Sequence, residues 1–255
     1  MKIDFKGKTV VITGGSTGIG LAIAEAFAQT GANVSICGRS ESKLAEAKKS
    51  FEEKNLTLHV KSVDVSNKDN IMRYADEVEE TFGSIDVWIS NAGVYPQFKI
   101  IDTPEDVWQN TLDINLKSIY YGAIIAKEKM SKNGGVLINA SSFAAIMPSV
   151  GSGLYAATKA AISSMTKTLA AELAPYNIRV NGYIPGVIET EMTNALIEKN
   201  GENMKSAIAM NRFGIGEDVA NAIVFLASEY ADYITGTFIE ISGGKLCVQN
   251  PTAAW

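Results

Sequence analysis

The chain predicts an α/β fold: a single domain built on a doubly wound, parallel sheet of seven strands with helices on both faces. Two observations lead to this expectation. Short apolar or β-branched runs alternate with amphipathic helical segments, an order typical of parallel sheets covered on both sides. The first run is followed at once by a glycine-rich turn and then by apolar residues at helical spacing. Right-handed crossovers between successive strands then wind the sheet in both directions.

Seven segments are expected to be strands because each is a short run rich in apolar or β-branched residues. They are Thr9–Thr13, Asn33–Cys37, Leu58–Val63, Val87–Ser90, Gly135–Ala140, Arg179–Ile184 and Thr237–Ile241. Helices are expected between them, where apolar residues recur every three or four positions. They are Ile19–Phe27, Glu41–Lys54, Lys68–Phe82, Pro104–Met130, Tyr155–Leu173 and Glu217–Ala227.

The length and composition predict a single domain that spans residues 1–255. With 255 residues and 46 % hydrophobic content, the chain can build one large core, and it contains no linker or repeat. The stretch 190–212 follows neither a strand nor a helix pattern, so it is expected to be an irregular insertion. We expect a lid over a ligand site at about residues 188–213.

Composition excludes several classes of protein. The net charge of −5 argues against nucleic acid as a partner, and no apolar run reaches the roughly 18 residues that span a membrane. The first residues do not form a secretory signal. Cys37 and Cys247 are far apart and are expected to be buried small residues of a cytoplasmic protein. His59, the only histidine, has no partner ligands, so no metal site is expected.

The glycine-rich turn is the first chemical element, at Thr13–Gly20 between the first strand and the first helix. A phosphate would meet backbone N–H groups and the positive end of the helix dipole there. Gly14 permits the tight turn, while Gly18 and Gly20 remove Cβ atoms where pyrophosphate and the neighbouring strand come close. Residues expected to bind a cofactor here are Gly14, Ser16, Thr17, Gly18, Ile19 and Gly20. The alternative is a turn that binds nothing.

The residues after the second strand indicate which nicotinamide cofactor binds. An NAD site usually has an acidic residue about 20 positions after the glycines, but no acid occurs from Thr30 to Ser40. Arg39 stands there instead, and its guanidinium suits the 2′-phosphate of NADP, with Ser40 as a further donor. NADP(H) is therefore expected over NAD(H). Thr17 is not the second basic residue that would strengthen this case, and Arg39 as a solvated surface residue is the alternative.

Two further strand ends are candidates for the same site. Asp64 and Val65 follow the third strand, where they would contact adenine; the alternative is that Asp64 caps the helix from Lys68. The sequence Asn91-Ala92-Gly93 follows the fourth strand, at the sheet edge where open α/β sheets bind ligands. Its small residues would let the cofactor ribose lie close, although a plain strand-end turn is the alternative.

Tyr155 and Lys159 are the candidate acid/base pair, because residues four apart share one face of a helix. A free tyrosine has a pKa of about 10, and lowering it by about three units takes roughly 4 kcal/mol, which a close ammonium and an oxidised nicotinamide could supply. Ser142 would hydrogen-bond the substrate carbonyl, and Asn115 would hold a water against Lys159. The alternatives are an ordinary helix face and, for Asn115, a polar residue in a kinked helix.

These motifs together resemble the short-chain dehydrogenase/reductase family, which has a Rossmann-type fold. The family's T-G-x-x-x-G-x-G turn, N-A-G, serine, Y-x-x-x-K and P-G occur here in that order, and the likeness extends to Ile241–Gly244. The resemblance implies catalytic roles for Asn115, Ser142 (rather than Ser141), Tyr155 and Lys159. It also implies that the nicotinamide carboxamide is held by the segment that contains Pro185, Gly186, Ile188 and Thr190.

The resemblance is strongest to 3-oxoacyl-carrier-protein reductases and hydroxysteroid dehydrogenases, and it implies a homotetramer. Residues 211–214 and 217–220 resemble the start of the helix that the family places at its tetramer interface, although Gly216 stands where proline is usual. Two other departures are Ser90 in place of a common asparagine and Ala145 in place of a common glycine. Those reductases dock an acidic carrier through basic residues, but near the corresponding positions this chain has Asn133 and Tyr176, which are not basic. Lys129 and Lys132 could compensate for them.

The expected substrate is a small carbonyl compound or alcohol, best an apolar ketone such as a steroid, because the residues expected near the pocket are mostly apolar. These residues are Val94, Tyr95, Phe98, Phe143, Ile146, Met147, Ile188, Met192, Leu196, Met204 and Met210. That many of them only pack the lid is the alternative. A 3-oxoacyl thioester reductase, an epimerase or dehydratase, and a non-catalytic NADP(H)-binding sensor stay open as other functions. The tail from Lys245 to Trp255 either packs on a neighbouring subunit or frays.

Overall fold

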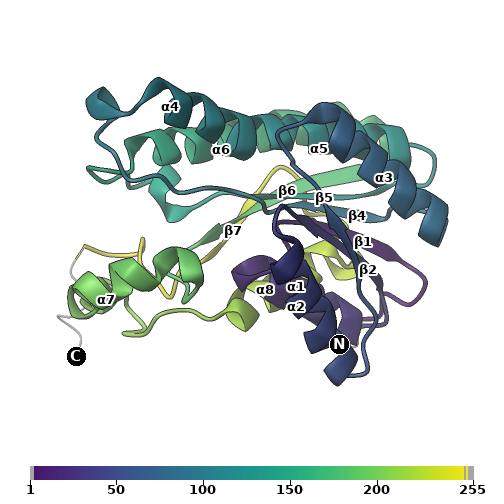
Figure 1. Cartoon of the computed structure of the whole chain (residues 1–255), viewed down its shortest axis with the longest axis horizontal. Helices are drawn as coiled ribbons and strands as arrows, with labels where there is room; N and C mark the ends of the chain where they lie inside the picture. The colour runs from purple at the N-terminus through teal and green to yellow at the C-terminus, as the bar shows by residue number, and fades with distance from the viewer. Residues whose placement is uncertain (1–2, 250, 252–255) are drawn as a thin grey trace.

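The computed structural model describes residues 3–249 and 251 and contains one parallel sheet of seven strands (Figure 1). The strand order is β3-β2-β1-β4-β5-β6-β7, so the winding direction reverses between β1 and β4. The strands are β1 (Thr9–Thr13), β2 (Asn33–Gly38), β3 (His59–Ser62), β4 (Val87–Ser90), β5 (Gly135–Ala140), β6 (Ile178–Pro185) and β7 (Phe238–Ile241). The expected doubly wound α/β fold is confirmed.

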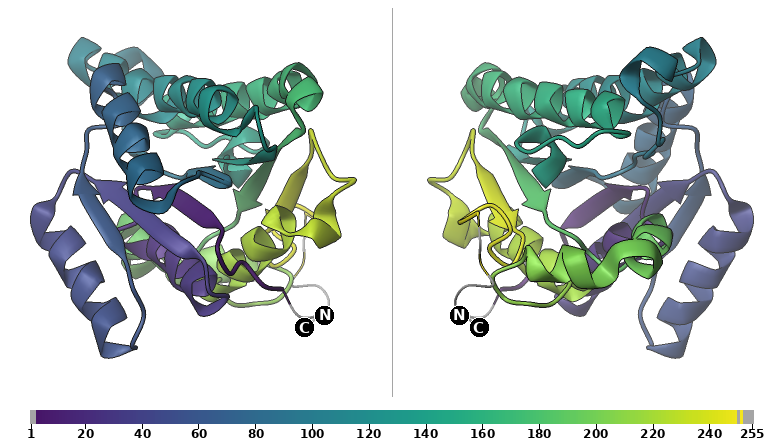
Figure 2. Two further views of the ribbon diagram at one scale, coloured as in Figure 1. Left: turned by 90° about the vertical axis from the view of Figure 1, so that its right-hand side faces the viewer. Right: turned by 90° about the vertical axis from the view of Figure 1, so that its left-hand side faces the viewer.

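Helices cover both faces of the sheet (Figures 1 and 2). The helices α3, α4, α5 and α6 lie on one face, while α1, α2 and α8 lie on the other. Their bounds are α1 (Gly18–Gln29), α2 (Glu41–Glu53), α3 (Lys68–Phe82), α4 (Glu105–Leu112), α5 (Ser118–Met130), α6 (Gly153–Leu173), α7 (Glu191–Ser206) and α8 (Gly216–Ala227). Among these described helices, none has the length and apolar character that crossing a bilayer requires.

The central strand explains why two separate cores form. All five residues of β1 are buried, and successive side chains point to opposite faces of the sheet. Val10 and Ile12 belong to the core beneath α1, α2 and α8. Val11 belongs to the other core, together with Trp88 and Tyr74. A strand buried on both faces has apolar or β-branched residues at successive positions, and the sequence of β1 has this pattern.

Two expected elements differ in the structure. The long helix expected at 104–130 is two helices, α4 and α5, joined by a π-helical turn at Asp113–Lys117. The expected irregular insertion is mostly the helix α7, which is kinked at Asn200. No described residue of α7 is fully buried, and only partly buried side chains such as Ile197 and Met204 pack on the neighbouring core, so its apolar pattern is weak and periodicity did not predict it. Cys37 is buried as expected, but Cys247 is exposed, so that prediction was wrong.

Candidate active site

A cleft of about 450 Å³ runs along the carboxyl ends of the strands. It is lined by residues that follow β1 to β4, by the ends of β5 and β6, and by the start of α7. All the residues expected to bind the cofactor line this cleft except Gly186 and Ile188. Gly186 packs so closely on Ser242 that an added Cβ would lie 2.7 Å from its Cα, and Ile188 is buried in the core. Of the four expected catalytic residues, Tyr155 and Lys159 line the cleft.

The glycine turn has the shape of a phosphate cradle. Gly14 and Gly18 have φ angles of +64° and +55°, a region that favours glycine. A Cβ at Gly20 would lie 2.3 Å from the Gly14 carbonyl oxygen, so a side chain there would break the turn. Among the described residues, no protein acceptor bonds the amides of Ser16 and Thr17, and the first turn of α1 has no acidic residue. A cofactor pyrophosphate therefore fits these free donors.

A hydrogen-bond network locks the turn to the end of β4. The Asn91 side-chain amide donates to the carbonyls of Thr13 (3.1 Å) and Gly14 (3.0 Å). The Thr13 hydroxyl oxygen accepts from the backbone amides of Asn91 and Ala92, each at 3.1 Å. The Tyr183 hydroxyl donates to Asn91 Oδ1 at 2.8 Å and also lines the cleft. The sequence reading missed Tyr183, although a tyrosine near the carboxyl end of a buried strand is a usable signal.

The second strand ends at the part of the cleft where a 2′-phosphate is expected. Arg39 is exposed there, and no described acidic residue pairs with it. Ser40 caps α2, since its hydroxyl oxygen accepts the backbone amide of Lys43 at 3.3 Å. Lys43 also lines the cleft, although the sequence reading did not select it.

Asp64 does not cap the next helix, so that alternative was wrong. Its carboxylate accepts from the backbone amide (3.0 Å) and hydroxyl (2.7 Å) of Ser66, which forms a local turn. Asn67 caps α3 instead, with its side-chain oxygen accepting the Asn70 amide at 3.0 Å. Asp64 and Val65 both line the cleft, and contact with adenine stays a prediction.

Helix α6 presents Tyr155 and Lys159 on one face. The Lys159 ammonium lies 5.6 Å from the centroid of the Tyr155 ring and donates to the Ala140 carbonyl at 2.8 Å. Lys159 is 4 % exposed, and no described carboxylate pairs with it. Ser142, at the end of β5, is also buried, and its hydroxyl accepts the Ala144 amide at 3.1 Å. The Tyr95 ring meets the Tyr155 ring edge-on, at 4.8 Å between centroids.

Burial controls the ionisation of this pair. It raises the pKa of Tyr155 to about 12, and a hydrogen bond from Ser142 offsets this only in part. Burial also lowers the pKa of Lys159 to about 8. The lowered pKa expected for Tyr155 depends on an oxidised nicotinamide beside it and stays a prediction. Without cofactor, Tyr155 is a protonated phenol at neutral pH.

Asn115 lies in the π-helical turn and is completely buried. Its side-chain oxygen accepts the Val94 amide at 2.8 Å, and its NH₂ donates to the Val94 carbonyl at 2.9 Å and to the Thr158 hydroxyl at 3.3 Å. Thr158 in turn donates to the Tyr155 carbonyl at 2.7 Å. The amide therefore ties the loop after β4 to α6, and its contact with a water stays a prediction. The alternative expected from the sequence, that Asn115 is a polar residue where the helix is interrupted, also agrees with its position in the π-helical turn.

Seven of the eleven apolar residues expected near the substrate fall into two groups. One group is exposed: Phe98, Ile146, Met147, Met192 and Met210. In the other, Phe143 and Met204 pack with a small buried cluster of Val187, Ile208 and Phe213. For these two, packing of the lid region is what the structure shows.

Comparison with known proteins identifies the family. The family model described as enoyl-(acyl carrier protein) reductase matches residues 14–245. The chain is 38 % identical over 240 residues to a 3-oxoacyl-[acyl-carrier-protein] reductase FabG of Thermotoga maritima, covering 94 % of this chain and 98 % of the relative. It is 39 % identical over 239 residues to an NAD-dependent glycerol dehydrogenase of Listeria innocua, covering 93 % of each.

A solved structure agrees with these sequence matches. A short-chain type dehydrogenase/reductase from Mycobacterium marinum superposes with a TM-score of 0.92 at 31 % identity, over 97 % of this chain and 98 % of that one. The chain therefore belongs to the short-chain dehydrogenase/reductase family and is an oxidoreductase.

Proposed function

We propose that this enzyme binds NADP(H) in preference to NAD(H) and reversibly reduces an apolar ketone, such as a steroid. One observation carries the proposal: Tyr155 lies beside Ser142 and Lys159, and both Tyr155 and Lys159 line the cleft that holds the free amides of the glycine turn. A phenol that is protonated near neutral pH can donate its proton to a developing alkoxide. We therefore propose ketone reduction as the favoured direction near neutral pH.

The residues would hold the cofactor in five places. The pyrophosphate would lie on the glycine turn, the 2′-phosphate at Arg39 and Ser40, and adenine at Asp64 and Val65. The ribose would lie against Asn91-Ala92-Gly93, and the carboxamide against the segment of Pro185, Gly186, Ile188 and Thr190. The bound nicotinamide would supply the hydride that reaches the carbonyl carbon.

The side chains of this chain would handle the proton. The hydroxyls of Ser142 and Tyr155 would donate hydrogen bonds to the carbonyl oxygen, and the Tyr155 proton would pass to it as it becomes an alcohol. The Lys159 ammonium would stabilise the phenolate that remains. Asn115 would hold a water that returns a proton through Lys159 to Tyr155.

The choice of NADP(H) rests on Arg39. No acidic residue occurs between residues 30 and 40, a range that includes β2 and the two residues after it. Arg39 is exposed and lines the cleft. The relatives do not decide the matter, since one of them is named an NAD-dependent dehydrogenase. We expect Arg39→Asp to weaken NADPH binding by about tenfold or more while changing NADH binding little, as measured by fluorescence titration. Equal losses for the two cofactors would contradict a phosphate contact.

The substrate proposal rests on exposed apolar side chains, of which Met192 lines the cleft, and on the charges around α5. Lys129, which could have compensated for the missing basic docking residues, is paired with Asp76 (2.6 Å) and Glu79 (2.7 Å). Neither Asn133 nor Tyr176 supplies a positive charge. Lys132 is exposed, and Lys127 lies 5.6 Å from the centroid of the Tyr176 ring, so some positive charge remains on this surface. Without basic residues at 133 and 176 the attraction for an acidic carrier protein would be weaker, which favours a free ketone over a 3-oxoacyl thioester.

Turnover against a mixed panel tests this function. NADPH consumption would be followed with steroid ketones, 3-oxoacyl thioesters, diketones and sugars. We expect the strongest rate with an apolar ketone; a strong rate only with thioesters would support the carrier-protein alternative. Tight NADPH binding without any turnover would support a sensor. We also propose a homotetramer in the cytoplasm, from the family resemblance, which light scattering and cell fractionation would check.

A further inference from the structure

An ion pair joins the two sides of the cleft beside the expected 2′-phosphate site. Lys43, in the first turn of α2, pairs with Glu191, the first residue of α7. Both side chains line the cleft together with Arg39 and Ser40. The contact thus links the segment that would recognise the phosphate with the lid region, although the two residues are 148 positions apart.

The start of α2 brings two cations to the same place. The Lys43 amide donates to the Ser40 hydroxyl, which fixes Lys43 one helical turn from Arg39. Arg39 has no acidic partner among the described residues, whereas the charge of Lys43 is balanced by Glu191. A phosphate monoester carries close to two negative charges at neutral pH, so it suits two cations and a capping hydroxyl.

We infer that Lys43 is a second cation of the 2′-phosphate site and that Glu191 is its internal counter-ion, which the phosphate replaces. This inference rests on the proposed use of NADP(H). NADP(H) would draw Lys43 away from Glu191 and leave that carboxylate unpaired. NAD(H), which lacks the phosphate, would leave the pair intact. Glu191 therefore competes with the 2′-phosphate of NADP(H) for Lys43, and it does not affect NAD(H).

The pair can be exchanged at small cost. Lys43 and Glu191 are 43 % and 64 % exposed, and ion pairs between such exposed side chains contribute little to stability. Hydrogen bonds of the Thr193 hydroxyl to the carbonyls of Ile188 (2.6 Å) and Thr190 (3.1 Å) anchor the start of α7, so the exchange needs only the Lys43 and Glu191 side chains to move. Thr190, just before Glu191, lies over the glycine turn, where a Cβ on Gly18 would be 3.1 Å from its methyl group. The Glu191 carboxylate therefore stays beside the cofactor site after the exchange.

Two neutralising variants with opposite effects test the inference. Dissociation constants for NADPH and NADH would be measured for the wild type, Lys43→Gln and Glu191→Gln. Lys43→Gln should weaken NADPH binding by about tenfold, and Glu191→Gln should tighten it by about threefold, with NADH unchanged in both. The matched control is Lys54→Gln, because Lys54 at the other end of α2 pairs with Glu25 (2.6 Å) and does not line the cleft. We expect no change there.

The outcomes separate this inference from the proposed function. Weaker or unchanged NADPH binding in Glu191→Gln would overturn the exchange, and so would equal losses of both cofactors in Lys43→Gln. If Arg39→Asp still lowers NADPH affinity selectively, the NADP(H) proposal survives that result. If Arg39→Asp has no selective effect either, the phosphate site fails as a whole.

Discussion

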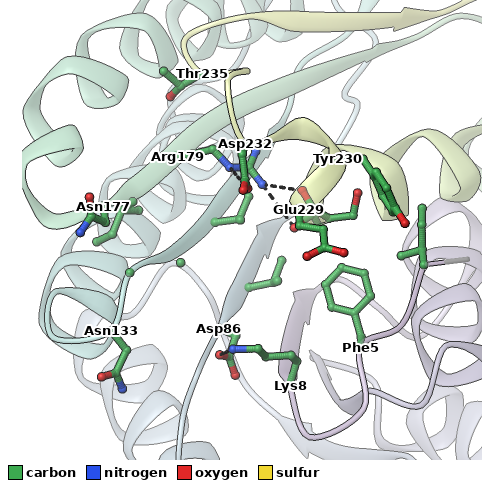
Figure 3. Close-up of a pocket in the computed structure, with 18 of the residues that line it drawn as sticks. Phe5, Lys8, Asp86, Asn133, Asn177, Arg179, Glu229, Tyr230, Asp232 and Thr235 are labelled. Carbon is green, nitrogen blue, oxygen red and sulfur yellow. Dashed lines mark hydrogen bonds and ion pairs between the residues drawn. The ribbon is translucent and has the colours of Figure 1, made fainter. Parts of the chain in front are cut away.

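The two ends of the parallel sheet each carry a cavity, and the larger one is not at the end that carries the predicted chemistry. The amino ends of β1, β4, β5 and β6 border a cavity of about 670 Å³, whose lining Figure 3 shows. The cleft at the carboxyl ends measures about 450 Å³. At the amino end, Lys8 and Asp86 pair at 2.8 Å. Arg179 donates to four backbone carbonyls, those of Leu226, Ala227, Ser228 and Ile234.

The difference between the two ends lies in their charges and free donors. The main polar groups at the amino end satisfy one another, so they offer little to a ligand. At the carboxyl end, the amides of Ser16 and Thr17 have no protein acceptor among the described residues, and Lys159 is a buried cation without a described carboxylate. Uncompensated polar groups, and not cavity size, therefore indicate the site.

The largest expected effect tests the carboxyl end directly. Tyr155→Phe should lower kcat by about 10³-fold, because it removes the proton donor, and should leave the NADPH dissociation constant nearly unchanged. Tyr230→Phe is the matched control, since Tyr230 lines the amino-end cavity and should keep full activity. Retained activity in Tyr155→Phe would remove this tyrosine from the mechanism.

A second variant tests whether the amino end is structural. Arg179→Met should lower the free energy of unfolding by about 2–4 kcal/mol, because several carbonyls lose their donor. The kcat/KM of the folded enzyme should stay unchanged. Arg212→Met gives the comparison: its guanidinium pairs with Asp218 at 2.7 Å but is 49 % exposed, so its loss should cost less. Loss of activity in stable Arg179→Met protein would contradict a purely structural role.

The smallest expected effect is on the free energy of unfolding, which the burial of the charged Lys159 side chain lowers. Its pKa is about 8 in the folded protein against 10.5 for a free lysine, so the unfolded chain binds more protons between these values. Wild-type stability should therefore rise as the pH increases through that window. Lys159→Met cannot titrate, and at pH 7 the cofactor-free variant should be more stable by about 1–3 kcal/mol. Denaturant titrations at pH 7 and near pH 10 would show whether this gain shrinks with pH; a gain that does not shrink would contradict burial as its cause.

Local patterns in the sequence predicted most of the fold and the cleft. The bounds of α3, β4 and β5 agree with the expected Lys68–Phe82, Val87–Ser90 and Gly135–Ala140. The glycine turn and the pair of Tyr155 and Lys159 were also found, because their spacing within one turn or one helix face is visible in the chain.

Features that depend on tertiary packing were missed. The helix α7 has only partly buried apolar residues, so its helical pattern is weak. The raised pKa of Tyr155 follows from burial that no motif reveals. The pairing of Lys43 with Glu191 joins residues far apart in the sequence. The bonds of Asn115 to Val94 likewise depend on how the π-helical turn faces the loop after β4.

The most decisive measurement is whether the enzyme transfers a hydride directly from the cofactor to the substrate. The enzyme would be given NADPH carrying deuterium at the transferable position of the nicotinamide, with the best ketone of the panel, and the alcohol would be analysed by mass spectrometry. We predict one deuterium on the new carbinol carbon and an equal amount of oxidised cofactor. A product without deuterium and an unconsumed cofactor would contradict the account, and would point to an epimerase, a dehydratase or a sensor on this fold.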